Sequence, residues 1–542
     1  MRARTVTVPV PPPRTIVIAE VSGLLLIGAL TAVGVPSGWL TIAAVALVVA
    51  VIATVRIHGR TGAGWALWWL RGRHQTTQAA TVAKGIDIRR GEQNYGVLRD
   101  ERTATAVVEI CGTQYTPTIL DGRGQALTSN TVPLQVLADQ LVQPGPLVLD
   151  GIDVVDAGFR VRRAQGYPPL YSTVFSEHPA RGNARTYAIM RLDIAASVQG
   201  LALRTTVEDA TAAAAERLVC ALREDGCRAR PLSLADITAL VDDLASPLTS
   251  GVSTAHNRYV DNDGHFWSTY VYSAEDISTA NLNDVWSWRV DGAVTAVTFS
   301  RTEEGRVRVS ALVRTQTPQP PALAPTVYLN TPVGEQPRAA MACVPGGPRM
   351  SDLPSAELSE LDGFTMPIGS AGVLIGTVNY ADGQRHPVLL PFTDPDRDTR
   401  VLMNTGLMFA RQMLLRNAAV GHPISVYTDN PTRWAGLNEL EPYIEIHQSP
   451  TDIPTLTPHI LVKDRRDGTA PVTAPTIISM PSDSSYPKGL APDIGLIQLD
   501  DHRVAIHTSR GQTKVHIATF PDEHPYLFPR QNSGVRGESR RR

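Results

Sequence analysis

Cysteine is scarce in this chain. Its 542 residues contain four cysteines, and no two of them form a C-x-x-C pair. Four scattered thiols do not make a disulfide framework, and they are typical of isolated core cysteines. The pattern therefore fits a reducing compartment. The four are Cys111, Cys220, Cys227 and Cys343.

Lysine is just as rare, and neither sign of charge dominates. The chain has four lysines, but Lys and Arg together number 50 against 52 Asp and Glu, so the net charge is −2. This balance excludes a general attraction to nucleic acid or to acidic surfaces. The length is sufficient for two or three domains with cores of their own.

The usual catalytic signatures are also missing. The sequence contains no G-x-x-x-x-G-K-[ST] loop, no G-x-S-x-G elbow and no H-E-x-x-H pair. The turn "MNTGLMFA" (403–410) has one glycine where a dinucleotide fingerprint needs three. We therefore expect no enzyme, no cofactor, no metal and no small-molecule substrate.

A few polar residues remain as candidate sites. Asp394 and Asp396 form an Asp-x-Asp that could hold a divalent metal and a sugar nucleotide, although an Asp-Pro turn is the favoured interpretation. Asp429 follows a buried strand, where open α/β sheets place ligand-binding residues, but the Asn-Pro after it indicates a plain turn. His256 and His265 flank a polar loop and are interpreted as structural.

Two apolar runs near the start of the chain predict a transmembrane hairpin. Residues 15–35 are nearly all apolar, with Glu20 as their one charge, and residues 39–55 form a second, shorter run. A helix needs about 20 such residues to cross a bilayer. A tight, uncharged turn joins the runs, so both ends of the hairpin emerge on the same side.

Arginines beside the two spans predict their orientation. Basic residues favour the cytoplasmic side of a membrane. They precede the first span and follow the second, whereas the connecting turn has none. Residues 1–14 and everything after the hairpin should therefore be cytoplasmic, in a multi-pass inner-membrane protein. The arginines are Arg2, Arg4, Arg14, Arg56, Arg60, Arg71 and Arg73.

A tryptophan-rich segment follows the hairpin. In "GWALWWLRGR" (64–73), Trp65, Trp68 and Trp69 are spaced to occupy the headgroup zone of the bilayer. Residues 56–90 are therefore predicted to be an interfacial segment followed by a polar connector.

The remainder is predicted to be mixed α/β, in two subdomains. A proline-rich connector (319–370) separates residues 91–318 from 371–528, and a basic, disordered tail follows at 529–542. Strands are predicted at 103–110, 185–194, 292–301 and 305–317, and a helix begins at a capping-box-like Thr206. Residues 399–431 read as a strand, a helix and a buried strand, a Rossmann-like unit.

Several stretches, in this order behind the hairpin, resemble the EccE family, a membrane component of the type VII (ESX) secretion systems of mycobacteria and related actinobacteria. The resemblance extends from about residue 1 to about residue 528. The stretches that carry it are "NYGVLRDERTATAVVEI" (94–110), "LVLDGIDVVDAGFRV" (147–161), "RTYAIMRLDIA" (185–195), "AAAERLVCALREDGCRARPLSLADI" (213–237) and "LLRNAAVGHPISVYTDNPTRWAGL" (414–437).

This resemblance implies a non-enzymatic structural subunit. Its expected partners are EccB, EccC (the ATPase) and EccD of the same inner-membrane complex, together with the bilayer. It also implies a cytoplasmic domain related in fold to degenerate glycosyltransferase-like α/β domains. The alternative hypothesis is a membrane-tethered glycosyltransferase-like enzyme that uses Asp394 and Asp396.

Overall fold

The computed structural model describes most of the chain after the predicted hairpin. The predicted spans 15–35 and 39–55 lie outside the described residues. Within the described part, no helix has the length and apolarity needed to cross a bilayer. The described residues are 56–57, 60–61, 84–121, 124–249, 259–262, 264–332, 335–350, 353–379, 383–466, 468–481 and 491–528.

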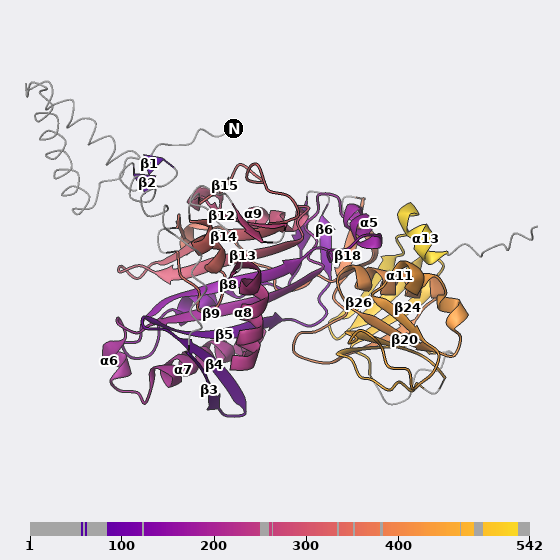
Figure 1. Cartoon of the computed structure of the whole chain (residues 1–542), viewed down its shortest axis with the longest axis horizontal. Coiled ribbons are helices and arrows are strands. Elements are labelled where there is room, and N and C mark those ends of the chain that lie inside the picture. Colours follow the sequence, from indigo (N-terminus) through magenta and orange to yellow (C-terminus); the bar gives the residue numbers. More distant parts are fainter. Residues whose placement is uncertain are drawn as a thin grey trace, which may run out of the picture.

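Two large sheets form the body of the molecule (Figure 1). The first sheet has the order β11-β12-β14-β13-β8-β9-β5-β4-β3, and all these neighbours are antiparallel. Its strands are β3 (Lys84–Arg90), β4 (Gln93–Arg99), β5 (Thr103–Gly112), β8 (Leu149–Phe159), β9 (Asn183–Asp193), β11 (Val260–Asn262), β12 (His265–Tyr272), β13 (Gly292–Arg301) and β14 (Val307–Thr317). Lys84–Arg90, which the sequence placed in a polar connector, is thus a strand of this sheet.

Helices cover both faces of the first sheet. Alternate residues of a strand point to opposite faces, so Val108 of β5 packs in one core and Val107 in another. The first core contains α7 (Val207–Glu224), and the second contains α8 (Leu234–Thr249) and α10 (Gln336–Met341). Burial on both faces explains why these strands read as continuous apolar runs.

Helix α7 begins and ends where its sequence indicates. The Thr206 hydroxyl caps its first turn by accepting a hydrogen bond from the backbone N–H of Asp209 (3.0 Å). Gly226 follows the helix with φ +80°, a conformation that glycine adopts without strain. The helix connects β9 to β10 (Arg228–Pro231), and both strands pair with β5, which runs antiparallel to them. In the predicted strand-helix-strand unit, β9 and β10 are therefore not neighbours, because β5 lies between them.

The second sheet is half parallel and half antiparallel. Its order is β21-β20-β22-β23-β19-β24-β25-β26-β17-β18-β6-β7, and the neighbours from β21 to β24 are parallel. Its strands are β6 (Thr118–Asp121), β7 (Gln125–Leu127), β17 (Val373–Asn379), β18 (Arg385–Leu390), β19 (Thr399–Asn404), β20 (Ile424–Thr428), β21 (Ile444–His447), β22 (Ile460–Asp464), β23 (Thr476–Ser479), β24 (Ile494–Asp500), β25 (Arg503–Thr508) and β26 (Gly511–His516).

The predicted strand-helix-strand unit at 399–431 is present as β19, α11 (Leu407–Ala419) and β20. Numbered by their order in the chain, however, the six parallel strands lie 3-2-4-5-1-6 across the sheet, which differs from the Rossmann order 3-2-1-4-5-6. The mixed α/β class is therefore confirmed, and the Rossmann-like description is not.

The two sheets are interlocked by the path of the chain. The hairpin β6–β7 leaves the first sheet after β5 and pairs through β6 with β18 at the edge of the second sheet. Helix α5 (Tyr167–Val174), between β8 and β9, packs in the core of the second sheet (Figure 1). Three elements of the predicted connector (319–370) belong with the first sheet. Helix α10 packs on it, and the short strands β15 (Leu329–Asn330) and β16 (Ala356–Glu357) pair with its strands.

Candidate functional site: the junction of the two sheets and its acidic groove

Most of the predicted membrane-interface residues lie outside the described part of the chain. The exceptions are Arg56 and Arg60, in the two-residue strands β1 (Arg56–Ile57) and β2 (Arg60–Thr61), which pair antiparallel. Their proposed role at the bilayer stays a prediction. The residues outside the described part are Arg14, Trp65, Trp68, Trp69, Arg71 and Arg73.

Asp394 is a structural partner of an arginine on the other sheet. Its two carboxylate oxygens accept hydrogen bonds of 3.0 and 2.6 Å from the guanidinium of Arg228 in β10. The Asp394 side chain is only 3% exposed, and it also accepts from the backbone N–H of Asp396 (2.9 Å), as in an Asp-Pro turn. A metal ion would have to displace Arg228 to reach this carboxylate. The glycosyltransferase alternative therefore has no support here.

We expect Asp394→Ala to lower the free energy of unfolding by about 2 kcal/mol, since it leaves the half-buried Arg228 without its bidentate partner. Asp396→Ala is the matched control. Its side chain is 30% exposed and 3.5 Å from Arg228, so the expected loss is below about 1 kcal/mol. Thermal unfolding of the full chain in mild detergent measures both. A midpoint raised by Mn²⁺ in the wild type and not in Asp394→Ala would favour a metal site instead.

The other polar candidates also have local partners. Asp429 accepts a hydrogen bond from the backbone N–H of Arg466 (2.9 Å), and its carboxylate lies 3.2 Å from Arg465. His265 contacts Arg163, while His256 lies outside the described residues. Among the residues that the structure describes, no three His, Cys, Asp or Glu side chains are grouped to hold a metal.

Buried arginines at the junction of the sheets are the residues that sequence reasoning missed. Arg162, just after β8, donates to the carbonyl of Ala418 (2.9 Å), pairs with Glu441 and lies 4.0 Å from the centre of the Tyr443 ring. Burial raises the pKa of Glu441 even though Arg162 opposes the shift. No local pattern could have identified this pair, because 279 residues separate its members.

A second arginine, Arg181, connects the junction to the groove described below. It pairs with the buried Asp156 (2.9 Å) and donates to the Pro367 carbonyl (2.8 Å). It also donates to Oδ1 of Asn283 (3.2 Å). Since a guanidinium is a donor only, this contact identifies Oδ1 as the acceptor and turns the NH₂ of Asn283 away from Arg181.

The buried His422 and the more exposed His459 lie at the same junction. The Nδ1 atoms of His422 and His459 are 3.3 Å apart. Burial, and then the neighbouring His459, lowers the pKa of His422 to about 3. Burial, and then Arg185 of β9, lowers the pKa of His459 as well. Both imidazoles are therefore neutral near pH 7, one donating to the other, and they are part of the packing.

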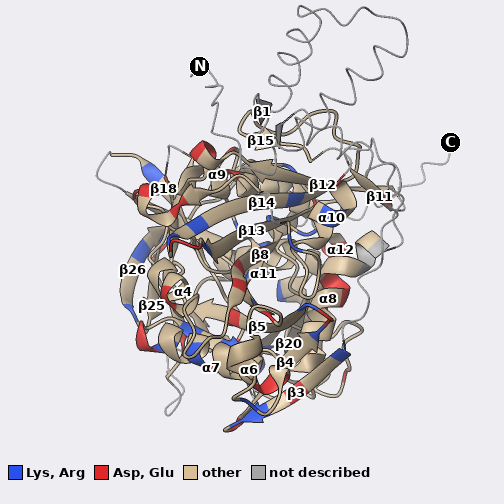
Figure 2. Ribbon diagram, turned by 90° about the vertical axis from the view of Figure 1, so that its left-hand side faces the viewer, with Lys and Arg blue, Asp and Glu red and all other residues tan. Residues whose placement is uncertain are grey.

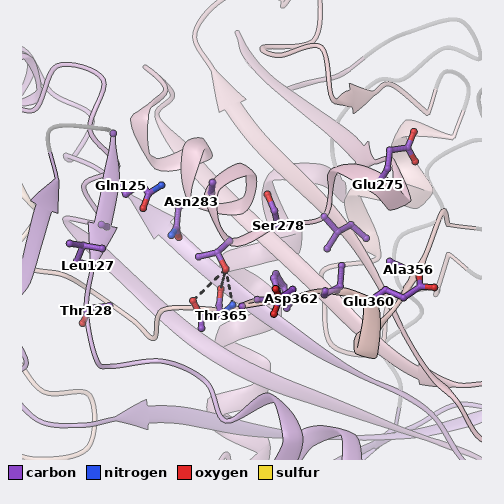
Figure 3. A pocket seen from close by; sticks show the side chains of 18 of the residues that line it. Gln125, Leu127, Thr128, Glu275, Ser278, Asn283, Ala356, Glu360, Asp362 and Thr365 are labelled. Carbon is purple, nitrogen blue, oxygen red and sulfur yellow. Dashed lines mark hydrogen bonds between the residues drawn. The ribbon is translucent and has the colours of Figure 1, made fainter. Parts of the chain in front are cut away.

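A groove opens where β7 meets the first sheet. It has a volume of about 1280 Å³ and is lined by β7, by the segment from η1 (Ala274–Asp276) through α9 (Thr279–Asp284), and by residues 355–365. Thr279 ties two walls together, because its hydroxyl accepts from the N–H of Thr365 (2.7 Å) and donates to the Thr365 carbonyl (3.0 Å) (Figure 3). The charged lining residues are all acidic.

Comparison with known proteins shows similarity to EccE proteins. The family model described as "type VII ESX secretion system translocon, EccE" matches residues 180–272. The chain is 28% identical over 458 residues to the ESX-2 secretion system protein EccE2 of Mycobacterium tuberculosis (strain CDC 1551 / Oshkosh), covering 83% of this chain and 81% of that protein. The chain is therefore similar to EccE proteins over most of its length.

Other EccE proteins are similar over slightly shorter stretches. The ESX-1 secretion system protein EccE1 of the same organism is 29% identical over 413 residues, which cover 72% of this chain and 77% of EccE1. The ESX-5 secretion system protein EccE5 of Mycobacterium marinum (strain ATCC BAA-535 / M) is 25% identical over 356 residues, covering 61% of this chain and 86% of EccE5.

The segment that matches the EccE family model runs from β9 to β12 and forms part of the first sheet with α7 and α8. It contains Arg181 and Arg228, which contact Asp156 and Asp394 at the junction, and Asp394 lies outside the matched segment. The EccE-matched part of the chain therefore supplies Arg228, one of the side chains that join the two sheets, whereas Arg162 and helix α5 lie outside it.

Proposed function

We propose that this chain is a non-enzymatic structural subunit of a type VII (ESX) secretion complex in the inner membrane. The observation that carries the proposal is its similarity to EccE2 and EccE1 over 83% and 72% of its length. Its polar chemistry supports the same conclusion, because the buried arginines contact carboxylates and carbonyls of the chain itself.

In this proposal the predicted hairpin (15–35 and 39–55) anchors the chain, and the interlocked body works by contact. Residues 1–14 and the body lie on the cytoplasmic side, with Arg14, Arg56, Arg60, Arg71 and Arg73 at the bilayer surface. The partners are EccB, EccC and EccD. A rigid body suits such a role, since two sheets joined by buried ion pairs present partners with one fixed surface.

Affinity purification of the tagged full chain in mild detergent, followed by mass spectrometry, tests the assembly. We expect EccB, EccC and EccD to co-elute in fixed proportion. The matched control carries the same tag and lacks residues 1–83, which leaves strand β3 in place, and it should recover much less of the three partners. Purification of a complete EccB–EccC–EccD assembly from which this chain is absent would contradict the proposal.

Cys220 provides a built-in test of the orientation. Of the four free cysteines, Cys220 is exposed and the other three are buried. We expect a maleimide that cannot cross membranes to label the chain only after the cells are broken, and Cys220→Ser to lose that labelling. Labelling of Cys220 in intact cells would place the body outside the cytoplasm.

In the view of Figure 2, acidic and basic residues are interspersed along the ribbon. An even mixture of this kind supports protein partners for the body over nucleic acid, which would favour one strongly basic face.

A further inference from the structure

We propose that the acidic groove beside β7 binds an arginine-rich, extended peptide, and that its occupant is residues 529–542 of this chain. The proposal goes beyond the structural role in the secretion complex, because it assigns a ligand to a surface that the body's architecture does not explain. Three observations support it: the charges of the groove, its free amide groups, and the reach and composition of the segment.

The groove carries three carboxylates without counter-charges. Glu275, Glu360 and Asp362 line it and are exposed, and no Lys or Arg is among the described lining residues. None of the three takes part in an ion pair within the described part of the chain. Several other carboxylates of the protein are paired with arginine, as at Asp394 and Glu441. The groove is therefore suited to guanidinium groups, which pair with carboxylates in a planar, two-bond geometry.

Two amide side chains line the groove, on the side away from Glu275 and Glu360 (Figure 3). Asn283 is 5% exposed, its Oδ1 is held by Arg181, and its Nδ2 has no protein partner within the described residues. Gln125 of β7 points toward it (Figure 3). This Nδ2 atom reaches the groove, where water or a ligand carbonyl can accept a hydrogen bond from it. A main-chain carbonyl of an extended peptide would satisfy it, and apolar lining such as Leu127 and Phe364 would contact the rest of the chain.

Residues 529–542 have the complementary chemistry. They read "PRQNSGVRGESRRR" and contain five arginines and one glutamate. The segment also carries two glycines and one proline, so it lacks helix-forming character and is suited to extended binding. It provides more positive charges than the three carboxylates of the groove require.

The segment can reach the groove from its point of attachment. Tyr526 lies beside Tyr167 at the start of α5, with ring centres 5.1 Å apart. Helix α5 has eight residues and is therefore about 12 Å long. Just after it, the Glu177 carbonyl lies 4.0 Å from the Cβ position of Gly124, which lines the groove. Fourteen extended residues span up to about 46 Å, more than twice the distance this path implies.

Cysteine cross-linking in the full chain tests the contact. In a Cys220→Ser background, Ala280→Cys places a thiol in the groove and Ser539→Cys places one in the segment. With a short bis-maleimide in mild detergent, we expect an intramolecular cross-link as the main product. A free peptide of residues 529–542 in excess should compete with it.

Charge reversal distinguishes a specific site from chance proximity. We expect Glu360→Lys with Asp362→Lys to lower the cross-linking rate by about tenfold, because each lost exposed ion pair weakens binding several-fold. Gln125→Leu should lower it by about threefold through the lost amide. The matched control is Glu303→Lys with Glu304→Lys, an exposed acidic pair in the β13–β14 turn, which should change nothing.

Three results would overturn the proposal. The first is the absence of a cross-link in the chain with Cys220→Ser, Ala280→Cys and Ser539→Cys, provided that this chain unfolds at the wild-type temperature. The second is a rate unaffected by reversal of the groove charges. The third is a cross-link formed only between two chains, one carrying Ala280→Cys and the other Ser539→Cys, which would assign the groove to the segment of a second copy.

Discussion

Arg416→Met is expected to lower the free energy of unfolding by about 3–5 kcal/mol, because it leaves a carboxylate buried without its counter-charge. Arg416 lies in α11 and is fully buried against Glu523, with N–O distances of 2.9 and 3.0 Å. Glu523 also accepts hydrogen bonds from Tyr167 (2.6 Å) and Gln412 (2.7 Å). The cluster therefore joins α11, α5 and the turn before α13 (His524–Leu527).

The pH dependence of this loss follows from the charges. Burial disfavours the ionised form of Glu523, but the charge and hydrogen bonds of Arg416 outweigh burial and hold its pKa below the usual range. Without Arg416, only the hydrogen bonds from Tyr167 and Gln412 still oppose burial, so this pKa rises and the protonated form folds at less cost. We therefore expect the difference between Arg416→Met and the wild type to shrink as the pH falls toward 4.

Urea unfolding of the full chain in mild detergent, followed by tryptophan fluorescence, measures the effect. Arg503→Met is the matched control, since Arg503 pairs with Asp500 on the surface of the same sheet and its side chain is 53% exposed. A surface pair of this kind contributes less than about 1 kcal/mol. Equal losses in the two variants would refute the role assigned to the buried cluster.

Tyr171→Ala is expected to lower the free energy of unfolding by about 3–5 kcal/mol and to destabilise both sheets together. Tyr171 is fully buried in α5, its ring packs on Phe175 with centres 4.9 Å apart, and its hydroxyl oxygen accepts from the backbone N–H of Leu374 (2.9 Å). Helix α5 lies in the chain between two strands of the first sheet, but it packs in the core of the second sheet. Removal of the Tyr171 ring should therefore loosen the contact between the two sheets.

Hydrogen–deuterium exchange resolved by peptide is the measurement. In Tyr171→Ala we expect amides of β5 in the first sheet and of β20 in the second to exchange faster by similar factors. Phe528→Ala removes an aromatic ring that is 55% exposed and should leave both unchanged. Faster exchange confined to β20 would show that the sheets unfold independently.

The sequence predicts much of the local structure because short-range chemistry determines it. The β13–β14 hairpin follows from two β-branched runs around Gly305, whose φ of +85° favours glycine. Thr206 and Gly226 define the ends of α7. The polar segment before residue 91 gives no such signal, since β3 lies at the sheet edge, where charged residues are favoured.

The candidate site shows how far this reasoning extends. The Asp-Pro turn at Asp394 is predictable, because the side chain bonds its own backbone two residues later. Its partner Arg228 is 166 residues away in the chain, and no pattern within a window of the sequence connects them. No local pattern connects Glu441 with Arg162 either, or the separate segments that form the walls of the groove.

By itself, the sequence determined the mixed α/β class, several of the strands and helices and the likeness to EccE proteins, since each depends on apolar periodicity, capping, turn chemistry or an ordered set of motifs. The hairpin stays a prediction from the same kind of pattern. Only the tertiary structure decided that the two predicted subdomains interlock, that their arginines and carboxylates pair across the junction, and that three acidic side chains share one groove. Those facts depend on contacts between residues more than eighty positions apart, which the packing of the whole chain selects.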